Sequence, residues 1–413
     1  MGDAARPTVH DAMARVVVDG DCMLFGGRKL TDIAIDVGRT PFYAYDRAAI
    51  TERIRDVRAH LPAGVHLHYA MKANPMPDVV RHIVGLVDGL DVASAGELNV
   101  ALAAGGHADT ISFAGPGKTV PELERALAVG AIVNLESAGE MRRLAALAAA
   151  SGRRARVAVR VNPDFELKSS GMKMSGGPKQ FGVDAEQVPD MLRELAGLPL
   201  DFVGFHIFAG SQNLSAAAII EAQSKAVQLA AELAAFAPAP VRVLNAGGGF
   251  GIPYFVSEKS LDLAPIGRHL EDLVGQSRRL LPEAVIVIEL GRYLVGEAGI
   301  YVCRVIDRKV SRGQTFLVTD GGLHHHLAAS GNFGQVLRKN YPVLIGNKVR
   351  GVRRETVSVV GPLCTPLDLL ADRAEMAEAV EGDLVVVLQS GAYGLTASPL
   401  GFLSHDAPAE VLV

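Results

Sequence analysis

Lys72 is the residue of this chain whose position most clearly suggests chemistry. It follows the run Val65–Ala70, whose mixture of apolar and polar residues predicts a strand that leads into a loop. A lysine at the mouth of a buried strand is partly desolvated, which favours the neutral amine and lets it form a Schiff base with a carbonyl compound. A surface lysine that follows a strand by chance would look the same, so the other motifs must decide.

The elements around Lys72 repeat one pattern: a short β-rich run, a loop and an amphipathic helical stretch. The predicted strands are Val65–Ala70, Leu90–Ala93, Ile111–Ala114, Ala131–Leu135, Arg156–Val161, Phe202–Phe208, Val241–Asn245 and Ala284–Glu289. Eight repeats over about 230 residues predict an α/β fold, a (β/α)8 TIM-like barrel, which usually takes about 250 residues. A doubly wound open sheet is the alternative.

After Gly291 the pattern changes to strands joined by turns, at Gly299–Arg308, Thr315–Asp320, Thr356–Val360 and Asp383–Gln389. This predicts a second, mainly β domain that resembles a Greek-key barrel. The segment up to Thr40 has one short apolar run, Cys22–Phe25, which we expect to add a strand to that domain. The predicted domains are a barrel at 41–295 and a β domain built from both chain ends, 1–40 plus 296–413.

The composition limits the function classes. The 413 residues are 49% hydrophobic, so the chain can bury a large core, and a net charge of -4 gives no basic footprint for nucleic acid. No apolar run reaches membrane-spanning length, and the N-terminus lacks an apolar signal core. Cys22, Cys303 and Cys364 are too far apart, and odd in number, for a disulfide framework or a zinc cluster. We expect a soluble, cytoplasmic protein.

Polar and glycine-rich segments follow the predicted strands, where barrel enzymes carry their active-site groups. These segments are Lys72, Ser94 with Glu97, Gly115–Lys118, Arg160–Pro163, His206–Asn213, Asn245–Gly251 and Glu289–Tyr293. Gly247, Gly248 and Gly249 expose backbone N–H groups after the seventh strand, where barrels commonly bind phosphate. A plain tight turn would also explain three glycines.

A phosphate site opposite a Schiff-base lysine points to pyridoxal phosphate as the cofactor. Glu289 then has a role, because a carboxylate can pair with the pyridinium nitrogen and keep it protonated, so that the ring serves as an electron sink. The alternative for Glu289 is an ion pair with Arg292 at the barrel mouth.

Six motifs together resemble the fold-type III pyridoxal-phosphate enzymes, specifically the ornithine/diaminopimelate decarboxylase family. They are Tyr69–Asn74 (YAMKAN), Asp91–Glu97 (DVASAGE), Gly247–Gly251 (GGGFG), Glu289–Arg292 (ELGR), Gly361–Cys364 (GPLC) and Gly391–Tyr393 (GAY). The resemblance covers nearly the whole chain, from Pro41 to Phe402.

The resemblance implies a role for each matching residue. Lys72 carries the Schiff base, Glu289 faces the pyridinium nitrogen, and Cys364 comes from the partner subunit and manages protonation. The cofactor-binding residues implied are Lys72, Asp91, Phe208, Ser211, Gly247, Gly248, Gly249, Glu289, Arg292 and Tyr393. We expect Lys72, Cys364 and His206 to be catalytic, no metal to be bound, and the protein to be a homodimer with shared active sites.

The chain departs from the family pattern at three places. Phe208 stands where the family usually has a histidine stacked on the cofactor ring, and either Phe208 or nearby His206 could cover the ring. Thr365 follows Cys364, where relatives carry an acid that reads the distal end of the substrate. The segment Asp164–Gln180, with Lys168, Lys173 and Lys179, predicts an additional polar loop.

Three further stretches are similar to a smaller group within the family. They are Lys173–Gly182, Gly321–His326 and Gly361–Pro366, and the group includes the glutamyl-carrier-protein decarboxylase of butirosin biosynthesis and the exosortase-associated decarboxylases. The triple histidine in the second stretch is not expected to bind metal, because adjacent histidines on a strand point to opposite faces. Polar residues near the dimer interface are the favoured interpretation.

The leading hypothesis is a pyridoxal-phosphate-dependent amino-acid α-decarboxylase. Without an acid at Thr365, its substrate is either an amino acid that lacks a distal ammonium or one linked to a carrier protein; an ordinary small amino acid is the alternative. A diaminopimelate decarboxylase or an amino-acid racemase of the same fold is the second enzymatic hypothesis. A catalytically silent homologue that binds a partner is the non-enzymatic one, but such a protein would need neither Lys72, Glu289 nor Cys364.

Overall fold

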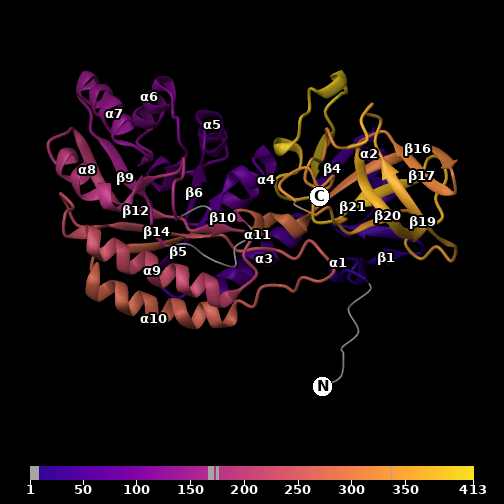
Figure 1. Cartoon of the computed structure of the whole chain (residues 1–413), viewed down its shortest axis with the longest axis horizontal. Coiled ribbons are helices and arrows are strands. Elements are labelled where there is room, and N and C mark those ends of the chain that lie inside the picture. The colour runs from indigo at the N-terminus through magenta and orange to yellow at the C-terminus, as the bar shows by residue number, and fades with distance from the viewer. Residues whose placement is uncertain (1–8, 166–171, 174–175, 336) are drawn as a thin grey trace. The chain divides into compact units, whose positions relative to one another are not determined.

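The computed structural model describes residues 9–165, 172–173, 176–335 and 337–413 (Figure 1). The chain divides into two units. One, here called the barrel unit, comprises Thr51–Ile252 and Ser260–Leu294. The other, the β unit, comprises the residues up to Ile50, Pro253–Lys259 and Val295–Val413.

The barrel unit is built on eight parallel strands that close into a ring. They are β5 (Val65–Ala70), β6 (Gly89–Val92), β7 (Ile111–Phe113), β8 (Ile132–Leu135), β9 (Ala155–Asn162), β12 (Leu200–Ile207), β14 (Val243–Gly248) and β15 (Val285–Leu290). Neighbours pair in the order β9-β12-β14-β15-β5-β6-β7-β8, and the pairing of β8 with β9 closes the ring. The predicted (β/α)8 barrel is therefore confirmed, and the open sheet is excluded.

Helices follow the strands and cover the outside of the barrel (Figure 1). They are α4 (Pro77–Val84), α5 (Ala95–Ala103), α6 (Val120–Val129), α7 (Ala138–Ser151), α8 (Val188–Leu195), α9 (Ala216–Ala234) and α10 (Ala264–Leu280), with α3 (Arg47–His60) ahead of β5. Their starts follow from local side chains: Ser94 caps α5, and Thr119 with Glu122 forms a capping box on α6. These caps set where the loops before α5 and α6 end.

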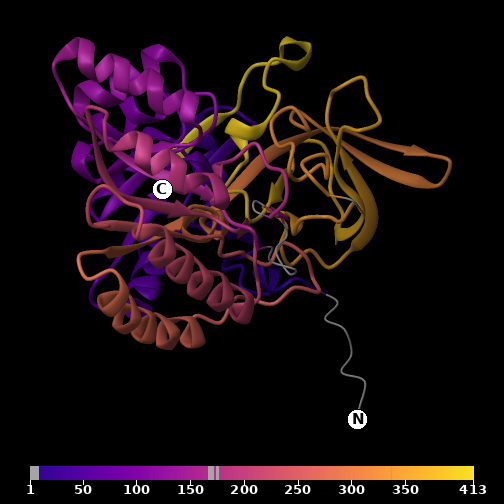
Figure 2. The same cartoon turned by 60° about the vertical axis from the view of Figure 1, so that its left-hand side comes forward.

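The β unit contains an eight-stranded, mostly antiparallel sheet. Its strands are β4 (Phe42–Tyr45), β16 (Gly299–Ser311), β17 (Gln314–Thr319), β18 (Val343–Ile345), β19 (Arg354–Val360), β20 (Leu369–Ala377), β21 (Leu384–Val387) and β22 (Ala409–Leu412). The order is β18-β21-β16-β17-β19-β20, and β4 pairs with both β16 and β22. The β16–β17 hairpin is the long orange ribbon in Figure 2.

The N-terminal segment contributes the expected strand to the β unit, but that strand lies outside the large sheet. Cys22–Phe25 is β2 of a separate three-stranded sheet with β1 (Val18–Asp19) and β3 (Arg28–Lys29). Met23 and Phe25 still pack into the core of the β unit, against residues such as Ile300. The strand that joins the large sheet is β4, which the predicted boundary at residue 41 assigned to the barrel.

The reason is that β4 is buried along its whole length and satisfies its backbone on both sides, with β16 antiparallel and β22 parallel. The apolar run Cys22–Phe25 instead alternates between buried and half-buried residues, so only one face of this strand packs against the core. The domain division consequently begins after Ile50, and it also gives Pro253–Lys259 to the β unit.

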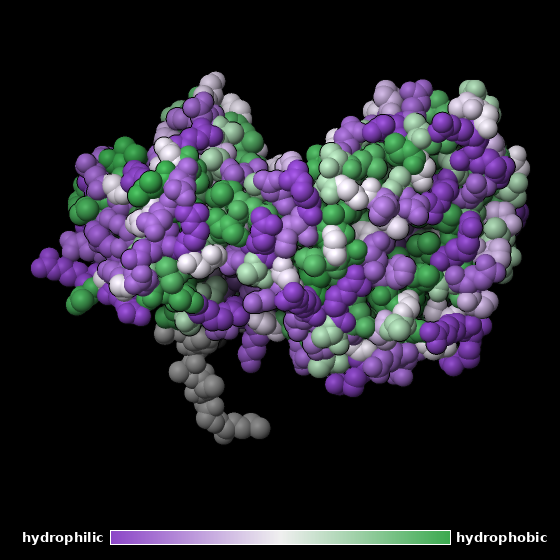
Figure 3. All heavy atoms as spheres, turned by 180° about the vertical axis from the view of Figure 1, so that it is seen from behind, coloured by the Kyte–Doolittle hydropathy of each residue, from purple (hydrophilic) through white to green (hydrophobic). Residues whose placement is uncertain are grey.

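Apolar side chains at the surface are interspersed with polar ones, as Figure 3 shows for one face. In the part of the chain that the structure describes, no helix combines the length and apolar composition needed to cross a bilayer.

Candidate active site

Four neighbouring barrel strands bring polar side chains to the same edge of the barrel. Lys72 lies in a short 3₁₀ helix, Met71–Ala73, directly after β5, and Glu289 lies near the end of β15. His206 is the second-last residue of β12, and Asn245 lies in β14. Because β12, β14, β15 and β5 are adjacent and parallel, these residues meet although the sequence separates them widely.

Lys72 and Glu289 form an ion pair at the centre of this group. The Lys72 Nζ donates to Glu289 Oε1 over 3.1 Å, and the carboxylate is 3% exposed whereas the lysine side chain is 44% exposed. Burial pushes the pKa of Glu289 upward, but the charge of Lys72 and the contact with His206 outweigh it and hold the pKa well below its ordinary value. Glu289 is therefore an anion at neutral pH, beside an accessible amine.

The second oxygen of Glu289 connects the pair to two other strands. Glu289 Oε2 lies 3.3 Å from His206 Nε2 and accepts a hydrogen bond of 3.3 Å from Asn245 Nδ2. Asn245 Oδ1 in turn accepts from the backbone N–H of Gly247 over 2.8 Å. The buried carboxylate is thus linked, through one asparagine, to the start of the glycine loop.

The three glycines are required by close backbone packing. A Cβ on Gly248 would overlap the carbonyl oxygen of Glu289, and one on Gly249 would overlap the carbonyl of Gly210. Gly247 and Gly249 also have φ of 72° and 70°, which L side chains rarely adopt. The loop is therefore a cradle that any side chain would fill, so a ligand can approach its backbone closely.

The geometry separates the roles open to Phe208 and His206. The Lys72 Nζ lies 5.8 Å from the centre of the Phe208 ring, whereas His206 is 2% exposed and contacts the carboxylate of Glu289. The two rings are nearly perpendicular, with centres 6.4 Å apart. Phe208 is thus the aromatic face beside the lysine amine, and His206 supports the buried acid.

Ser211 and the predicted polar loop are connected through their backbones. Ser211 lies in β13 (Gly210–Ser211), which pairs antiparallel with β10 (Met172–Lys173). The loop is also held at Asn162, whose Nδ2 donates to Gly177 O over 3.1 Å. Lys168 lies outside the described residues, and Lys179 is half-buried. The segment after β9 therefore returns to the loop that follows β12.

Sequence reasoning missed the pairing of His68 with Asp91. His68 Nδ1 lies 3.4 Å from Asp91 Oδ2, and both side chains are less than a tenth exposed. The histidine ring occupies the space above its cross-strand partner Gly89, where a Cβ would overlap the ring. The signal in the sequence was Gly89, directly before the apolar run that begins at Leu90. A glycine there indicates that another group approaches the backbone closely, but it does not indicate which group.

Lys118 and Arg160 belong to a second, buried ionic group on the far side of the barrel. Lys118 Nζ donates to Glu140 Oε1 over 2.7 Å, and Arg160 Nη1 donates to Glu136 Oε1 over 2.8 Å. Burial raises the pKa of Glu136, but Arg160 outweighs this and keeps the pKa below its ordinary value. Glu136 also accepts from Gly182 N, so this group braces the loops after β8 and β9.

The remaining predicted site residues are distributed between the units. Arg292 begins the short helix α11 (Arg292–Val295), three residues after Glu289. Cys364 and Tyr393 lie in the β unit. Cys364 is exposed in the turn after β19, and Tyr393 is half-buried after β21 with a positive φ of 53°.

The triple histidine is a turn, so the assumption that it lies on a strand was wrong. His326 Nε2 lies 2.9 Å from Ser390 Oγ, and His325 Nε2 lies 3.0 Å from the carbonyl of Asp406. Burial lowers the pKa of His324 to about 3 and that of His325 to about 4. The three rings are therefore neutral core groups of the β unit. Nowhere in residues 9–165, 172–173, 176–335 and 337–413 do three or more His, Cys, Asp or Glu gather as metal ligands.

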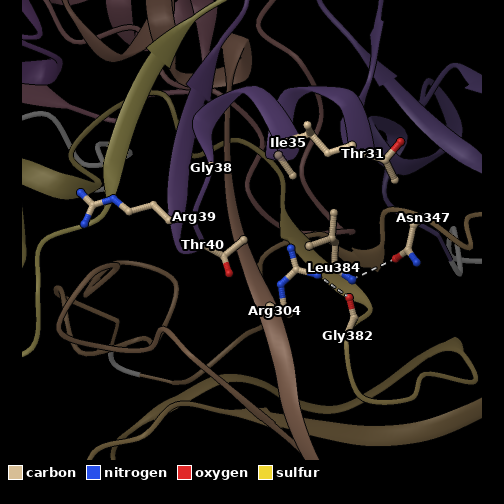
Figure 4. Close-up of a pocket in the computed structure, with 10 residues that line it drawn as sticks. Thr31, Ile35, Gly38, Arg39, Thr40, Arg304, Asn347, Gly382 and Leu384 are labelled. Carbon is tan, nitrogen blue, oxygen red and sulfur yellow. Dashed lines mark hydrogen bonds between the residues drawn. The ribbon is translucent and has the colours of Figure 1, made fainter.

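A pocket in the β unit contains none of the predicted site residues (Figure 4). Its lining includes Arg39, Arg304 and Asn347. Arg304 Nη1 donates to Gly382 O over 2.9 Å, and Asn347 Oδ1 accepts from Leu384 N over 2.9 Å. These side chains stabilise the turn before β21, so the pocket offers no comparable chemistry.

Comparison with known proteins shows the family to which the chain belongs. Residues 47–296 match the family described as "Pyridoxal-dependent decarboxylase, pyridoxal binding domain". This chain belongs to that family. It is an enzyme, a decarboxylase, and its cofactor is pyridoxal phosphate.

Individual relatives agree with this assignment over most of their length. The chain is 40% identical to the L-glutamyl-[BtrI acyl-carrier protein] decarboxylase of Niallia circulans, over 90% of this chain and 88% of that protein. It is 33% identical to a diaminopimelate decarboxylase of Aquifex aeolicus, over 96% and 91%. The crystal structure of diaminopimelate decarboxylase from Helicobacter pylori complexed with L-lysine superposes with a TM-score of 0.82 at 26% identity, over 93% and 94%.

The barrel residues fit this cofactor. The glycine cradle suits its phosphate, the accessible amine of Lys72 suits its aldehyde, and the buried anion of Glu289 suits its ring nitrogen.

Proposed function

We propose that this decarboxylase acts on an amino acid whose far end lacks an ammonium group, and specifically on an aminoacyl group carried by an acyl-carrier protein. The observation that carries the proposal is Thr365. Its hydroxyl accepts the backbone N–H of Leu367 over 3.3 Å and bears no charge, so it offers a distal ammonium no anionic partner. The Niallia circulans relative, by its name, acts on a carrier-linked glutamyl group.

In this proposal the barrel residues bind and orient the cofactor. Lys72 would bind the aldehyde of the cofactor. The Gly247–Gly249 loop, with Ser211 and Arg292 of the barrel unit and Tyr393 of the β unit, would hold its phosphate. Glu289 would keep the ring nitrogen protonated, and Phe208, whose ring centre lies 5.8 Å from Lys72 Nζ, would pack against the cofactor ring. When bound, the cofactor supplies an electron sink for the pair released as carbon dioxide leaves.

The remaining residues transfer a proton or hold other site residues in position. Cys364 delivers the proton to the substrate carbon after the carboxylate has left. His206 holds Glu289 in place at 3.3 Å, and Asp91, paired with His68, is among the cofactor-binding residues.

Three alternatives are disfavoured by particular residues. A diaminopimelate decarboxylase would need an acid to read a distal ammonium, and Thr365 disfavours it. A racemase of the same fold is disfavoured by the combination of Gly361–Cys364 with Glu289–Arg292. A silent partner-binding homologue would have no use for the Lys72–Glu289 pair. A cytoplasmic location is supported by Cys22, Cys303 and Cys364, which are all free thiols.

The substrate is tested by assaying carbon dioxide release. We expect an aminoacyl-carrier protein, with glutamyl as the first choice, to be turned over efficiently, and free ornithine, lysine and meso-diaminopimelate to be poor substrates. Neutralising Lys168, Lys173 and Lys179 together should raise KM for the carrier substrate about tenfold, because cations favour a phosphate-bearing arm and an acidic carrier surface. Efficient turnover of any of the three free diamino acids, or an unchanged KM after neutralisation, would contradict the proposal.

Assembly is tested by subunit complementation. We propose a homodimer in which Cys364 completes the site of the partner subunit. Mixing inactive Lys72→Ala protein with inactive Cys364→Ala protein should then restore activity, up to about a quarter of the wild-type value with random exchange, because half of the dimers are mixed and each has one intact site. If tagged subunits demonstrably exchange and activity stays absent, the site lies within one chain.

A further inference from the structure

The turn that carries Cys364 is held by one buried carboxylate, Asp368. The side chain is 3% exposed in the β unit. Its Oδ2 accepts the backbone N–H of Leu363, the residue before Cys364, over 2.8 Å. Its Oδ1 accepts the N–H of Leu323, the residue before His324, over 2.6 Å. The two oxygens therefore join two turns that are about 40 residues apart in the chain.

Glycines on both turns make room for this carboxylate. A Cβ on Gly322 or on Gly361 would overlap the oxygens of Asp368. The same residue also closes the Cys364 turn through its backbone, because Gly361 N donates to Asp368 O over 3.2 Å and Asp368 N donates to Thr365 O over 3.2 Å. Asp368 thus contacts the turn before Cys364, at Gly361 and Leu363, and after it, at Thr365.

A carboxylate is the group that this arrangement needs. Both bonds run from backbone N–H donors, and a carboxylate accepts at both oxygens, whereas an asparagine would direct its own N–H₂ group at one of the donors. Hydrogen bonds of an anion to backbone N–H groups are shorter and stronger than neutral ones. Burial raises the pKa of Asp368, and its hydrogen bonds from Leu323 and Leu363 oppose that rise.

We propose that Asp368 is the positioning residue of the decarboxylation step: it locks the Cys364 turn to the Gly321–His326 turn and thereby fixes the direction of the Cys364 thiol. The inference concerns geometry around the thiol and rests on the proposed function for what the thiol does. We call the two side-chain hydrogen bonds of Asp368 the clamp. Loss of the clamp is predicted to change the reaction products in the same way as loss of Cys364, while the cofactor stays bound.

The test compares Asp368→Asn with Asp383→Asn in the holoenzyme. Asp383 is a suitable control because it is another buried aspartate of the β unit, which accepts from Val380 N over 2.7 Å and pairs with Lys348. The rate of Cys364 alkylation by iodoacetamide is measured by peptide mass, with Cys22 as an internal reference. We expect Asp368→Asn to change the Cys364 rate about fivefold or more and Asp383→Asn to leave it within about twofold.

A second measurement follows the fate of the proton during turnover. If the thiol is misdirected, the proton goes to the cofactor carbon in place of the substrate carbon, and hydrolysis then releases an aldehyde and leaves pyridoxamine phosphate. Asp368→Asn should raise the fraction of turnovers that end this way, as Cys364→Ala should, and Asp383→Asn should not. A purely structural role would lower the melting temperature in both aspartate variants and leave this ratio unchanged.

The two measurements distinguish failure of the Asp368 inference from failure of the proposed function. If Cys364→Ala leaves the product ratio unchanged, the role assigned to Cys364 fails, while the alkylation rate still judges the clamp. If Asp368→Asn does not fold, Gly361→Ala, which pushes a methyl group against the carboxylate, is measured in the same way. A folded Asp368→Asn or Gly361→Ala enzyme with the wild-type rate of Cys364 alkylation would overturn the inference.

Discussion

Lys72→Ala is expected to abolish the covalent attachment of pyridoxal phosphate and to lower turnover by a factor on the order of 10³ or more. The Lys72 side chain is nearly half exposed, and its amine lies 3.1 Å from the buried Glu289. Wild-type protein should absorb visible light as a protein-bound Schiff base does, and borohydride reduction should leave a pyridoxyl mass on the Lys72 peptide.

A matched control for this experiment is Lys225→Ala. Lys225 is also in the barrel unit and also pairs with a glutamate, Glu221, but it lies on the outer helix α9. Its loss should leave labelling and activity unchanged. A reduced label on any lysine other than Lys72, or protein that cannot be reconstituted with the cofactor, would refute the assignment of the active site.

Glu289→Gln is expected to retain the cofactor and to lose turnover by a factor of about 10² or more. The substitution keeps the shape of the side chain and removes its charge, so the ring nitrogen loses the anion that keeps it protonated. Burial alone would raise the pKa of Glu289, but Lys72 and His206 hold it well below its ordinary value of 4.5. The carboxylate therefore stays charged as the pH falls until the pH reaches that lowered value.

This gives a sign for the pH dependence. A depressed pKa means that the Lys72–Glu289 attraction is fully present above the ordinary pKa and is lost only as the pH falls through the lower, folded-state value. In the cofactor-free protein, stability lost between about pH 8 and pH 5 thus belongs to groups other than Glu289. The melting temperature of the cofactor-free protein as a function of pH measures this, and Glu283→Gln on the surface ahead of β15 is the control. Full activity in Glu289→Gln would remove the acid from the mechanism.

Much of the barrel was accessible from sequence because its signals are local. Each strand, such as Val65–Ala70 or Val285–Leu290, is a short β-rich run bounded by polar or glycine-rich residues, and backbone geometry converts that pattern into an element. Loops after parallel strands meet at one edge, so the fold alone brings Lys72, Glu289 and the glycines together. The family motifs then name their chemistry.

Long-range pairing could not be obtained in the same way. The strand Phe42–Tyr45 reads like any other apolar run, and its place between β16 and β22 depends on partners more than 250 residues away. The three consecutive histidines were interpreted as a strand, but they form a turn whose rings are buried by contacts such as that of His326 with Ser390. A local sequence pattern indicates the conformation that a segment prefers. Segments far away in the chain can override this preference by pairing or packing with it, and the local pattern does not identify them.

The sequence by itself determined the barrel and placed a lysine, a glycine-rich loop and an acid at one edge of it, because strand periodicity and the order of loops imply a shared edge. Only the tertiary structure decided that Phe208 lies beside Lys72 while His206 supports Glu289, and that Asp368 clamps the turn of Cys364. These depend on distances of 3 to 6 Å between side chains on different strands or turns, and no one-dimensional spacing encodes such distances.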